Sequence, residues 1–136
     1  MPHQTTWTVS GVEWRYFGHV TPIETRGACQ ACYADPRADY MIYQLIDLRD
    51  ITRLDFPLFD QELSAAFDAS AAASIPDVRV AFIAPDNRFN AALDVYLDLI
   101  NRTSWQARTF FDADEARAWC ERRETDGSRE RAASRA

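Results

Sequence analysis

The chain has 136 residues, of which 47% are hydrophobic and 26% are charged, and its formal net charge at pH 7 is -6. This length fits one domain with a single continuous core, and the composition is that of a folded globular protein, not of a disordered chain. No run approaches the roughly 20 apolar residues that span a bilayer, and residues 1–6 lack the basic start and apolar core of a signal peptide, so a cytoplasmic location is predicted.

The charge is distributed unevenly along the chain. Residues 122–136 carry five Arg against three acidic residues, which leaves a net charge of -8 on residues 1–121. An acidic body repels phosphate backbones, which argues against nucleic acid as a partner. Residues 1–121 are predicted to form one domain, and residues 122–136, where the apolar periodicity ends, are predicted to be a disordered Arg-rich tail.

The first elements are predicted to be two short strands over residues 7–9 and 12–17, joined by the Ser10-Gly11 turn into a hairpin. The second strand is expected to end at Gly18. One face of this strand is predicted to carry three large side chains, Val12, Trp14 and Tyr16.

A helix is predicted from Thr21 to about Ala34. Thr21 suits the N-cap, Pro22 suits the first helical position, and Glu24 would complete a capping box with Thr21. The helix should end before Pro36, because the residue that precedes a proline is pushed out of the helical region.

The stretch over residues 41–46 is an apolar run that only Gln44 interrupts, as in a strand whose two faces are both covered by helices. A charged cluster of Asp47, Arg49 and Asp50 ends this run. Ligands of open α/β sheets are met at the carboxyl ends of the strands, so Asp47 and Asp50 are candidates for binding a ligand or partner. The alternative is that they only solvate a loop.

A second helix is predicted to begin near Pro57 and to end before Pro76. Four apolar residues fall at spacings of four, three and one and are expected to form a stripe buried in the core: Phe59, Leu63, Ala66 and Phe67.

The rest of the chain repeats this alternation. Strands are predicted over residues 78–84 and 105–110, and a helix between them has apolar residues at helical spacing, namely Phe89, Leu93, Tyr96, Leu97 and Ile100. A final short helix follows the cap at Asp112, with Ala116, Trp119 and Cys120 facing one way. The order β-β-α-β-α-β-α-β-α predicts an α/β fold with a mainly parallel five-stranded sheet, and it leaves the strand order open.

Cys29 and Cys32 have the spacing of thioredoxin-like redox sites and of half a zinc site. A redox thiol needs a helix N-terminus directly after a strand, where the dipole lowers its pKa, whereas this pair falls well inside the predicted helix. A metal site would find only Cys120 as a third thiol, with His3 and His19 as the histidines. Packing of reduced thiols is therefore the prediction, and no catalytic residue, cofactor or metal is predicted.

Four segments resemble the bacterial SpoIIAA-like proteins of the STAS type, which are related in fold to the CRAL-TRIO lipid-binding domains. They are residues 18–21 before the first helix, 45–51 at the central strand, 78–86, and 110–119. The resemblance covers roughly residues 5–121 and implies a SpoIIAA-like fold. None of these segments is a catalytic signature, so it implies a fold better than an activity.

Anti-sigma-factor antagonists of this fold carry a phosphorylated serine at the start of the second helix. The matching residues 54–58 (Leu-Asp-Phe-Pro-Leu) have no hydroxyl, so no phosphoserine switch is expected here, although Thr52 lies close by. An apolar rim segment of Phe56, Leu58 and Phe59 takes that place. We expect it either to pack into the core or to stay exposed and meet a hydrophobic partner.

The sequence therefore predicts a non-enzymatic regulatory or binding module. The leading hypothesis is that the module binds a protein partner or a small apolar ligand at the carboxyl ends of the strands. The candidate surface consists of Phe56, Leu58, Phe59, Asp47 and Asp50. The alternative is amphitropic binding to lipid at a membrane surface, and an enzyme that uses Cys29 and Cys32 is the weakest interpretation. The oligomeric state is left open.

Overall fold

The computed structural model describes residues 3–54, 58–84 and 89–122. The elements are β1 (His3–Trp7), β2 (Gly11–Val20), α1 (Pro22–Ala34), a 3-10 helix η1 (Pro36–Tyr40), β3 (Tyr43–Leu54), α2 (Leu58–Ala72), β4 (Arg79–Ile83), α3 (Asn90–Ile100), β5 (Gln106–Phe110) and α4 (Ala113–Arg122). This order confirms the predicted β-β-α-β-α-β-α-β-α chain. The tail predicted over residues 122–136 lies outside the described residues, apart from Arg122.

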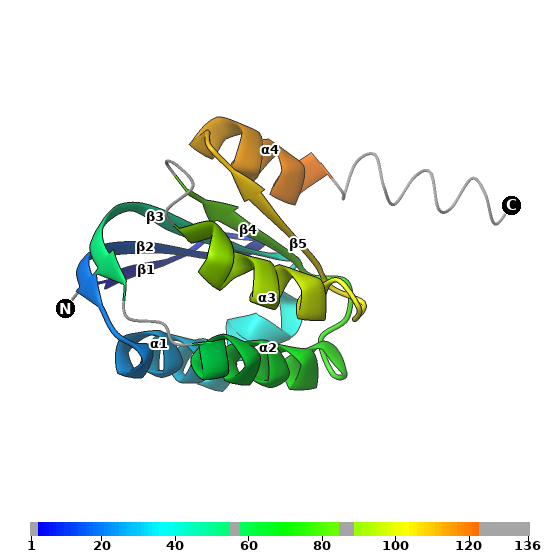
Figure 1. The fold of residues 1–136 in the computed structure, drawn as a ribbon. Coiled ribbons are helices and arrows are strands. Elements are labelled where there is room, and N and C mark those ends of the chain that lie inside the picture. Colours follow the sequence, from blue (N-terminus) through cyan, green and yellow to red (C-terminus); the bar gives the residue numbers. More distant parts are fainter. Residues whose placement is uncertain (1–2, 55–57, 85–88, 123–136) are drawn as a thin grey trace, which may run out of the picture.

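The five strands form one sheet in the order β1-β2-β3-β4-β5. β1 pairs antiparallel with β2, and the pairs β2–β3, β3–β4 and β4–β5 are parallel. The mainly parallel sheet and the central position of β3 are therefore confirmed. Helices α1, α2 and α3 lie on one side of the sheet and α4 on the other (Figure 1).

Both faces of the central strands are buried. Ile46 and Leu48 of β3 join the larger core beneath α1, α2 and α3, whereas Tyr43 and Leu45 join the smaller core beneath α4. Successive side chains of a strand point to opposite faces, so an apolar run is needed when helices cover both. The predicted shared face of Val12, Trp14 and Tyr16 on β2 is the buried one, because all three residues are buried.

Strand β2 runs beyond its predicted end. The chain passes Gly18 with a φ of 67°, a left-handed conformation that glycine adopts without strain, and pairing with β3 continues to Val20. The prediction that the strand ends at Gly18 is therefore wrong, since the glycine accommodates a register shift between Gly18 and His19 instead of a stop.

Strand β3 is also longer than predicted, and the prediction that it ends at the charged cluster is wrong. Residues 47–54 stay in the sheet because they pair with β2, where Asp47 lies opposite Arg15 and Asp50 opposite Phe17. β4 ends beside Asp47, so the second half of β3 has only β2 as a neighbour. The charged side chains can therefore reach water while Leu48 and Ile51 stay buried.

Helix α1 begins at Pro22 and ends at Ala34, as predicted, with Thr21 at the N-cap. The Thr21 side chain makes no capping hydrogen bond, so the expected capping box does not form. Thr25 instead donates a hydrogen bond from Oγ1 to the Pro22 carbonyl at 3.0 Å.

Helix α2 presents a different face to the core from the one predicted. Leu63 and Phe67 are 39% and 43% exposed, Ala66 is exposed, and the side chain of Phe59 is outside the described residues. The buried positions are Ala65, Asp68 and Ala72. The predicted stripe is therefore wrong for Leu63, Ala66 and Phe67, because small alanines let α2 lie close to its neighbours and a buried carboxyl takes the central position.

Candidate functional site

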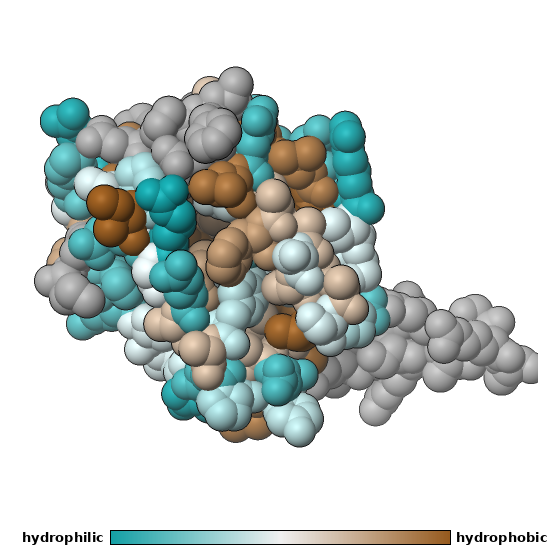
Figure 2. Space-filling view, turned by 90° about the horizontal axis from the view of Figure 1, so that it is seen from below, coloured by the Kyte–Doolittle hydropathy of each residue, from teal (hydrophilic) through white to brown (hydrophobic). Residues whose placement is uncertain are grey.

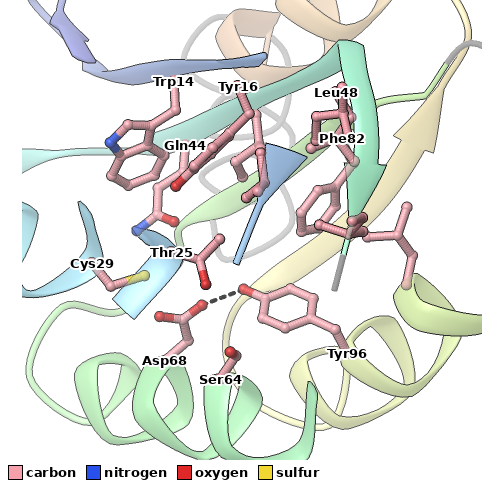
Figure 3. A pocket seen from close by; sticks show the side chains of 15 residues that line it. Trp14, Tyr16, Thr25, Cys29, Gln44, Leu48, Ser64, Asp68, Phe82 and Tyr96 are labelled. Atoms are coloured by element: carbon pink, nitrogen blue, oxygen red, sulfur yellow. Dashed lines mark hydrogen bonds between the residues drawn. The ribbon is translucent and has the colours of Figure 1, made fainter. Parts of the chain in front are cut away.

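A cavity lies between the sheet and the three helices α1, α2 and α3, and its volume is about 100 Å³ (Figure 3). Most of its lining is apolar and comes from every layer around it. The lining residues are Trp14, Tyr16 and Val20 of β2, Thr25 and Cys29 of α1, Gln44, Ile46, Leu48, Ile51 and Leu54 of β3, Ser64 and Asp68 of α2, Phe82 of β4, and Leu93 and Tyr96 of α3.

The polar wall of this central cavity is built around Asp68 of α2. Its Oδ1 accepts a hydrogen bond from the Tyr33 hydroxyl at 2.6 Å, and its Oδ2 accepts one from the Tyr96 hydroxyl at 2.5 Å (Figure 3 draws the second). Tyr33 belongs to α1 and Tyr96 to α3. One buried carboxyl therefore ties three helices together above the sheet.

A third residue fixes the direction of one of these bonds. Gln44 of β3 donates from Nε2 to the Tyr33 hydroxyl oxygen at 3.3 Å. Because the Tyr33 oxygen accepts this bond, its own proton is directed to Asp68. Gln44 is thus the polar residue that interrupts the apolar run of the central strand, and its role is to link the sheet to the Tyr33–Asp68 pair.

Burial controls the ionisation of these groups. The apolar surroundings raise the pKa of the Asp68 carboxyl, while the hydrogen bonds from Tyr33 and Tyr96 act in the opposite direction. Burial, followed by the nearby Asp68 charge, raises the pKa of Tyr33 and of Tyr96. Both phenols therefore keep their protons and serve as donors to the carboxyl.

Two further polar side chains, Trp14 and Tyr16, lie in the cavity wall. The buried Trp14 Nε1–H has no hydrogen-bond acceptor among the described residues. Burial raises the pKa of the Tyr16 hydroxyl, which is therefore neutral as well. Unmet polar groups in a largely apolar cavity are the usual means by which a site orients a small ligand.

A groove lies outside the cavity, between α1 and α2. This helix groove has a volume of about 180 Å³ and is lined by Arg26, Cys29, Leu63, Ser64 and Phe67. Cys29 and Ser64 line the central cavity as well, so the groove and the cavity adjoin. Figure 2 shows the molecule from below, where α1 and α2 lie, and a hollow is visible on this face among hydrophobic and hydrophilic residues.

The cysteines occupy protected positions. Cys29 is half-buried, and Cys32 and Cys120 are buried and free. Desolvation, followed by the charge of Asp68, raises the pKa of the Cys29 thiol and raises that of Cys32 to about 12. This is the opposite of the shift that a nucleophilic thiol requires. In the described ranges, no group of three or more His, Cys, Asp and Glu side chains could hold a metal ion.

The candidates Asp47 and Asp50 lie away from the cavity. Asp47 pairs with Arg49 at 2.7 Å and lines an outer crevice between α4 and the open part of the sheet, together with Glu13 and Arg117. Asp50 pairs with Arg15 at 2.8 Å. Each predicted acidic candidate thus has an Arg partner of its own, and neither lines the central cavity.

The apolar rim segment falls largely beyond what the structure describes. Phe56 lies outside the described residues, and Leu58 and Phe59 begin α2 with side chains that are also outside them. The central cavity nevertheless reaches the carboxyl ends of β2 and β3, because its lining includes Val20, Ile51 and Leu54, which lie there.

The sequence did not indicate the roles of Asp68 and Tyr96, which line the cavity, or of Tyr33, which is hydrogen-bonded to Asp68. One signal was available, because Asp68 follows Ala65 by three positions and precedes Ala72 by four, so the three share a helix face of otherwise small residues. The stripe of larger apolar residues on the same helix, which includes Leu63 and Phe67, was the stronger signal for the buried face. None of the helices in the described part of the chain has the length and apolar character of a membrane-spanning helix.

Comparison with solved structures identifies the fold. The chain matches an uncharacterised protein of the DUF3478 family with a SpoIIAA-like fold from Shewanella loihica PV-4, at 17% identity and a TM-score of 0.49, over 87% of this chain and 91% of that chain. It also matches the anti-sigma factor antagonist SpoIIAA in its unphosphorylated form, at 12% identity and a TM-score of 0.51, over 83% of this chain and 91% of that chain. No family model and no curated protein matches the chain. The fold is therefore SpoIIAA-like, as the sequence resemblance implied.

Proposed function

We propose that this SpoIIAA-like domain is a non-catalytic binding module that holds a small, mainly apolar ligand with one polar group in the central cavity. The observation that carries this proposal is the cavity itself, an apolar space of about 100 Å³ with the Asp68 carboxyl in one wall. Ligand sites in proteins are typically concave and apolar, with a few well-placed polar groups that orient the ligand.

The volume limits the size of the ligand. A cavity of about 150 Å³ lined by apolar side chains stays dry and binds benzene. The central cavity is smaller, so its occupant has about as many non-hydrogen atoms as benzene or fewer, unless it extends into the adjoining helix groove. The ligand would enter from the groove or from the carboxyl ends of β2 and β3, where a binding site is predicted from the sequence.

The non-catalytic assignment is supported by the chemistry of the thiols. Burial raises the pKa of Cys29, Cys32 and Cys120, so none of them has the reactivity of a catalytic cysteine. The module also works without a phosphoserine switch in this proposal, because residues 54–58 offer no hydroxyl. A cytoplasmic location stays a prediction.

Neutral probes of matching size test the proposal. Benzene and isobutanol are added to the folded protein, and chemical-shift changes are followed by NMR at Trp14, Tyr96 and Leu93, which line the cavity. We expect saturable shifts at those residues, with a dissociation constant on the order of 1 mM for so small a ligand. Saturable shifts elsewhere, with none at the cavity residues, would contradict the proposal.

A cavity-filling variant provides the matched control. Val20 is fully buried in the cavity wall, whereas Val9 is 104% exposed in the hairpin turn, so the same change to Phe fills the cavity at one position and only adds surface at the other. Val20→Phe should abolish probe binding and Val9→Phe should leave it unchanged. Far-UV circular dichroism of both variants verifies that each is folded.

A second candidate function is favoured by the exposed apolar side chains of α2. Leu63 and Phe67 lie on the surface at the helix groove, and Phe67 stacks on Tyr33 with ring centroids 6.0 Å apart. We propose a protein partner at this surface as the alternative, and the fold relative SpoIIAA is an anti-sigma factor antagonist by name. Loss of a co-purified partner with Leu63→Ser and Phe67→Ser, but not with Phe111→Ser on the α4 side, would support it.

Binding to a membrane surface is the remaining alternative, and it depends on the rim segment Phe56, Leu58 and Phe59. Liposome flotation tests it with the unchanged protein and with Phe56→Ser and Phe59→Ser. Flotation that requires lipid and is lost in the two variants would support this function, and the absence of flotation in all three proteins would rule it out.

A further inference from the structure

The hydrogen bonds of Asp68 suit the ionised form of its carboxyl. Both oxygens accept hydroxyl protons, at 2.6 Å from Tyr33 and 2.5 Å from Tyr96, and bonds of O–H to a charged oxygen lie at 2.5–2.7 Å. A protonated carboxyl would itself have to donate a hydrogen bond. The Tyr33 hydroxyl takes part in two bonds, as acceptor from Gln44 and as donor to Asp68.

The ionised form of Asp68 would be stabilised by a compensating charge. Asp68 is 5% exposed, and burial of a charge is costly unless a counter-charge pairs with it. The lining of the cavity, within the described residues, contains no Arg and no His. Arg26 lines the adjoining helix groove, where it is exposed to water, and it does not line the cavity. The two tyrosines contribute partial charges only.

The walls around the carboxylate are aromatic. Trp14, Tyr16, Phe82 and Tyr96 all line the cavity, and Phe82 and Tyr96 meet edge to face with ring centroids 5.3 Å apart (Figure 3). The face of an aromatic ring carries partial negative charge and attracts cations, most strongly where water is excluded. The carboxylate and the rings therefore favour the same kind of ligand.

We propose that the central cavity binds a small organic cation, an alkylammonium or quaternary ammonium group, which pairs with the Asp68 carboxylate and packs against the surrounding rings. This inference rests on the proposed function and names the chemical class of its ligand. The volume of about 100 Å³ restricts the cation to a few carbon atoms around the nitrogen. Asp68 supplies the counter-charge, and the aromatic and aliphatic walls supply the contact surface.

A neutral ligand with a hydroxyl group is the competing possibility. It would donate a hydrogen bond to Asp68 and would occupy the same apolar space, but it would leave the buried negative charge uncompensated. A cation and an alcohol of the same shape therefore separate the two possibilities. Isobutylammonium and isobutanol form such a pair, because they differ only in the group that would face the carboxylate.

The charge of Asp68 makes binding of a cation depend on pH. Burial raises the pKa of this carboxyl, so part of the free protein must lose a proton before the cation binds. The titratable groups facing Asp68 are Tyr33, Cys29 and Cys32 from α1, Tyr96 from α3 and Tyr16 from β2, all neutral because burial raises each pKa. Affinity for tetramethylammonium, whose charge is fixed, should therefore rise up to tenfold per pH unit below the pKa of Asp68 and level off above it.

The test compares isobutylammonium chloride and isobutanol by isothermal titration and by NMR shifts at the cavity residues. We expect isobutylammonium to bind the unchanged protein at least tenfold more tightly than isobutanol. Asp68→Asn, which keeps the shape of the side chain, should erase this difference and retain binding of isobutanol. If the variant does not fold, the pH dependence of tetramethylammonium binding to the unchanged protein gives the same information.

The outcomes separate the inference from the function on which it rests. If isobutanol binds at the cavity residues as tightly as isobutylammonium or more tightly, the inference of a cationic ligand is wrong. The proposed function, binding of a small ligand, would still stand. If the affinity for tetramethylammonium does not change with pH, the inference that a cation pairs with Asp68 is also wrong. If neither probe shifts the cavity residues, both the inference and the proposed function fail.

Discussion

The Tyr96 hydroxyl donates a hydrogen bond to Asp68 Oδ2 at 2.5 Å, and this bond joins α3 to α2 beside the central cavity. The two residues are 28 positions apart in the chain, and the second acceptor oxygen of Asp68 is used by Tyr33 of α1. The same carboxyl group thus joins the three helices and presents polar atoms to the cavity. In the proposed function, stability and ligand binding are therefore linked through one side chain.

Removing this hydroxyl should destabilise the fold. Tyr96→Phe leaves the ring in place and deletes one hydrogen bond to the carboxylate, which should lower the free energy of unfolding by about 1.5–3 kcal/mol. Urea denaturation followed by circular dichroism measures the change. Tyr40→Phe is the matched control, because Tyr40 is 84% exposed and its hydroxyl faces water. Equal effects of the two changes would contradict a role for the Tyr96–Asp68 bond.

The titration of Asp68 should appear in the pH dependence of stability. Burial raises its pKa in the folded state, so the folded protein holds this proton at pH values where the unfolded chain has lost it. The contribution of Asp68 to the free energy of unfolding is fully present below the pKa that this carboxyl has in the unfolded chain. It is lost as pH rises through the pKa that the carboxyl has in the folded protein. The free energy of unfolding of the unchanged protein, measured relative to Asp68→Asn, should therefore fall with rising pH. A relative rise would show that the pKa is lowered instead.

The two glycines Gly11 and Gly27 should respond in opposite directions to replacement by Ala. A Cβ at Gly11 would lie 2.4 Å from the Tyr43 carbonyl oxygen and 2.7 Å from its ring, so Gly11→Ala should cost about 1–3 kcal/mol. A Cβ at Gly27 in α1 meets nothing within 4 Å, and Gly27→Ala should gain about 0.5–1 kcal/mol from helix propensity. Thermal unfolding of the two variants measures both, and a neutral Gly11→Ala would argue against this close approach of β2 to Tyr43.

Leu63 of α2, compared with the buried Leu93 of α3, tests whether the predicted stripe of α2 is buried. Leu63 is exposed at the helix groove, whereas Leu93 is 5% exposed in the cavity wall. Leu93→Ala should cost about 2–5 kcal/mol in the free energy of unfolding, and Leu63→Ala less than about 1 kcal/mol. Denaturant titration of both variants measures the difference. A large loss with Leu63→Ala would restore the stripe predicted from the spacing.

The thiols should react slowly in the folded protein. Burial raises the pKa of Cys32 and of Cys120 to about 12 and that of Cys29 further, so the reactive thiolate is scarce near neutral pH. Titration with a chromogenic disulfide at pH 8 should give full reaction of all three only in denaturant. Rapid reaction of Cys29 or Cys32 in the folded protein, with a rate that reports a depressed pKa, would revive the redox interpretation.

Local sequence was enough for much of the fold. Pro22 and Pro36 bracket α1, and the apolar runs of β3 and β4 predicted strands with both faces covered, because such signals act within a few residues. The same logic failed at the end of β3. Whether Asp47 and Asp50 leave the sheet depends on how far β2 continues to pair with β3. The residues near these two aspartates do not predict the length of that pairing.

The central cavity depends on contacts between residues far apart in the chain. Local sequence predicts that α2 is a helix with large apolar residues at Leu63 and Phe67, and their spacing alone would bury them. The folded chain buries Asp68 instead, because two tyrosine hydroxyls from α1 and α3 approach it from positions 35 and 28 residues away, and each needs an acceptor inside the core. The periodicity of a helix shows which residues share a face. Which face is buried depends on the side chains that neighbouring helices bring into contact with it.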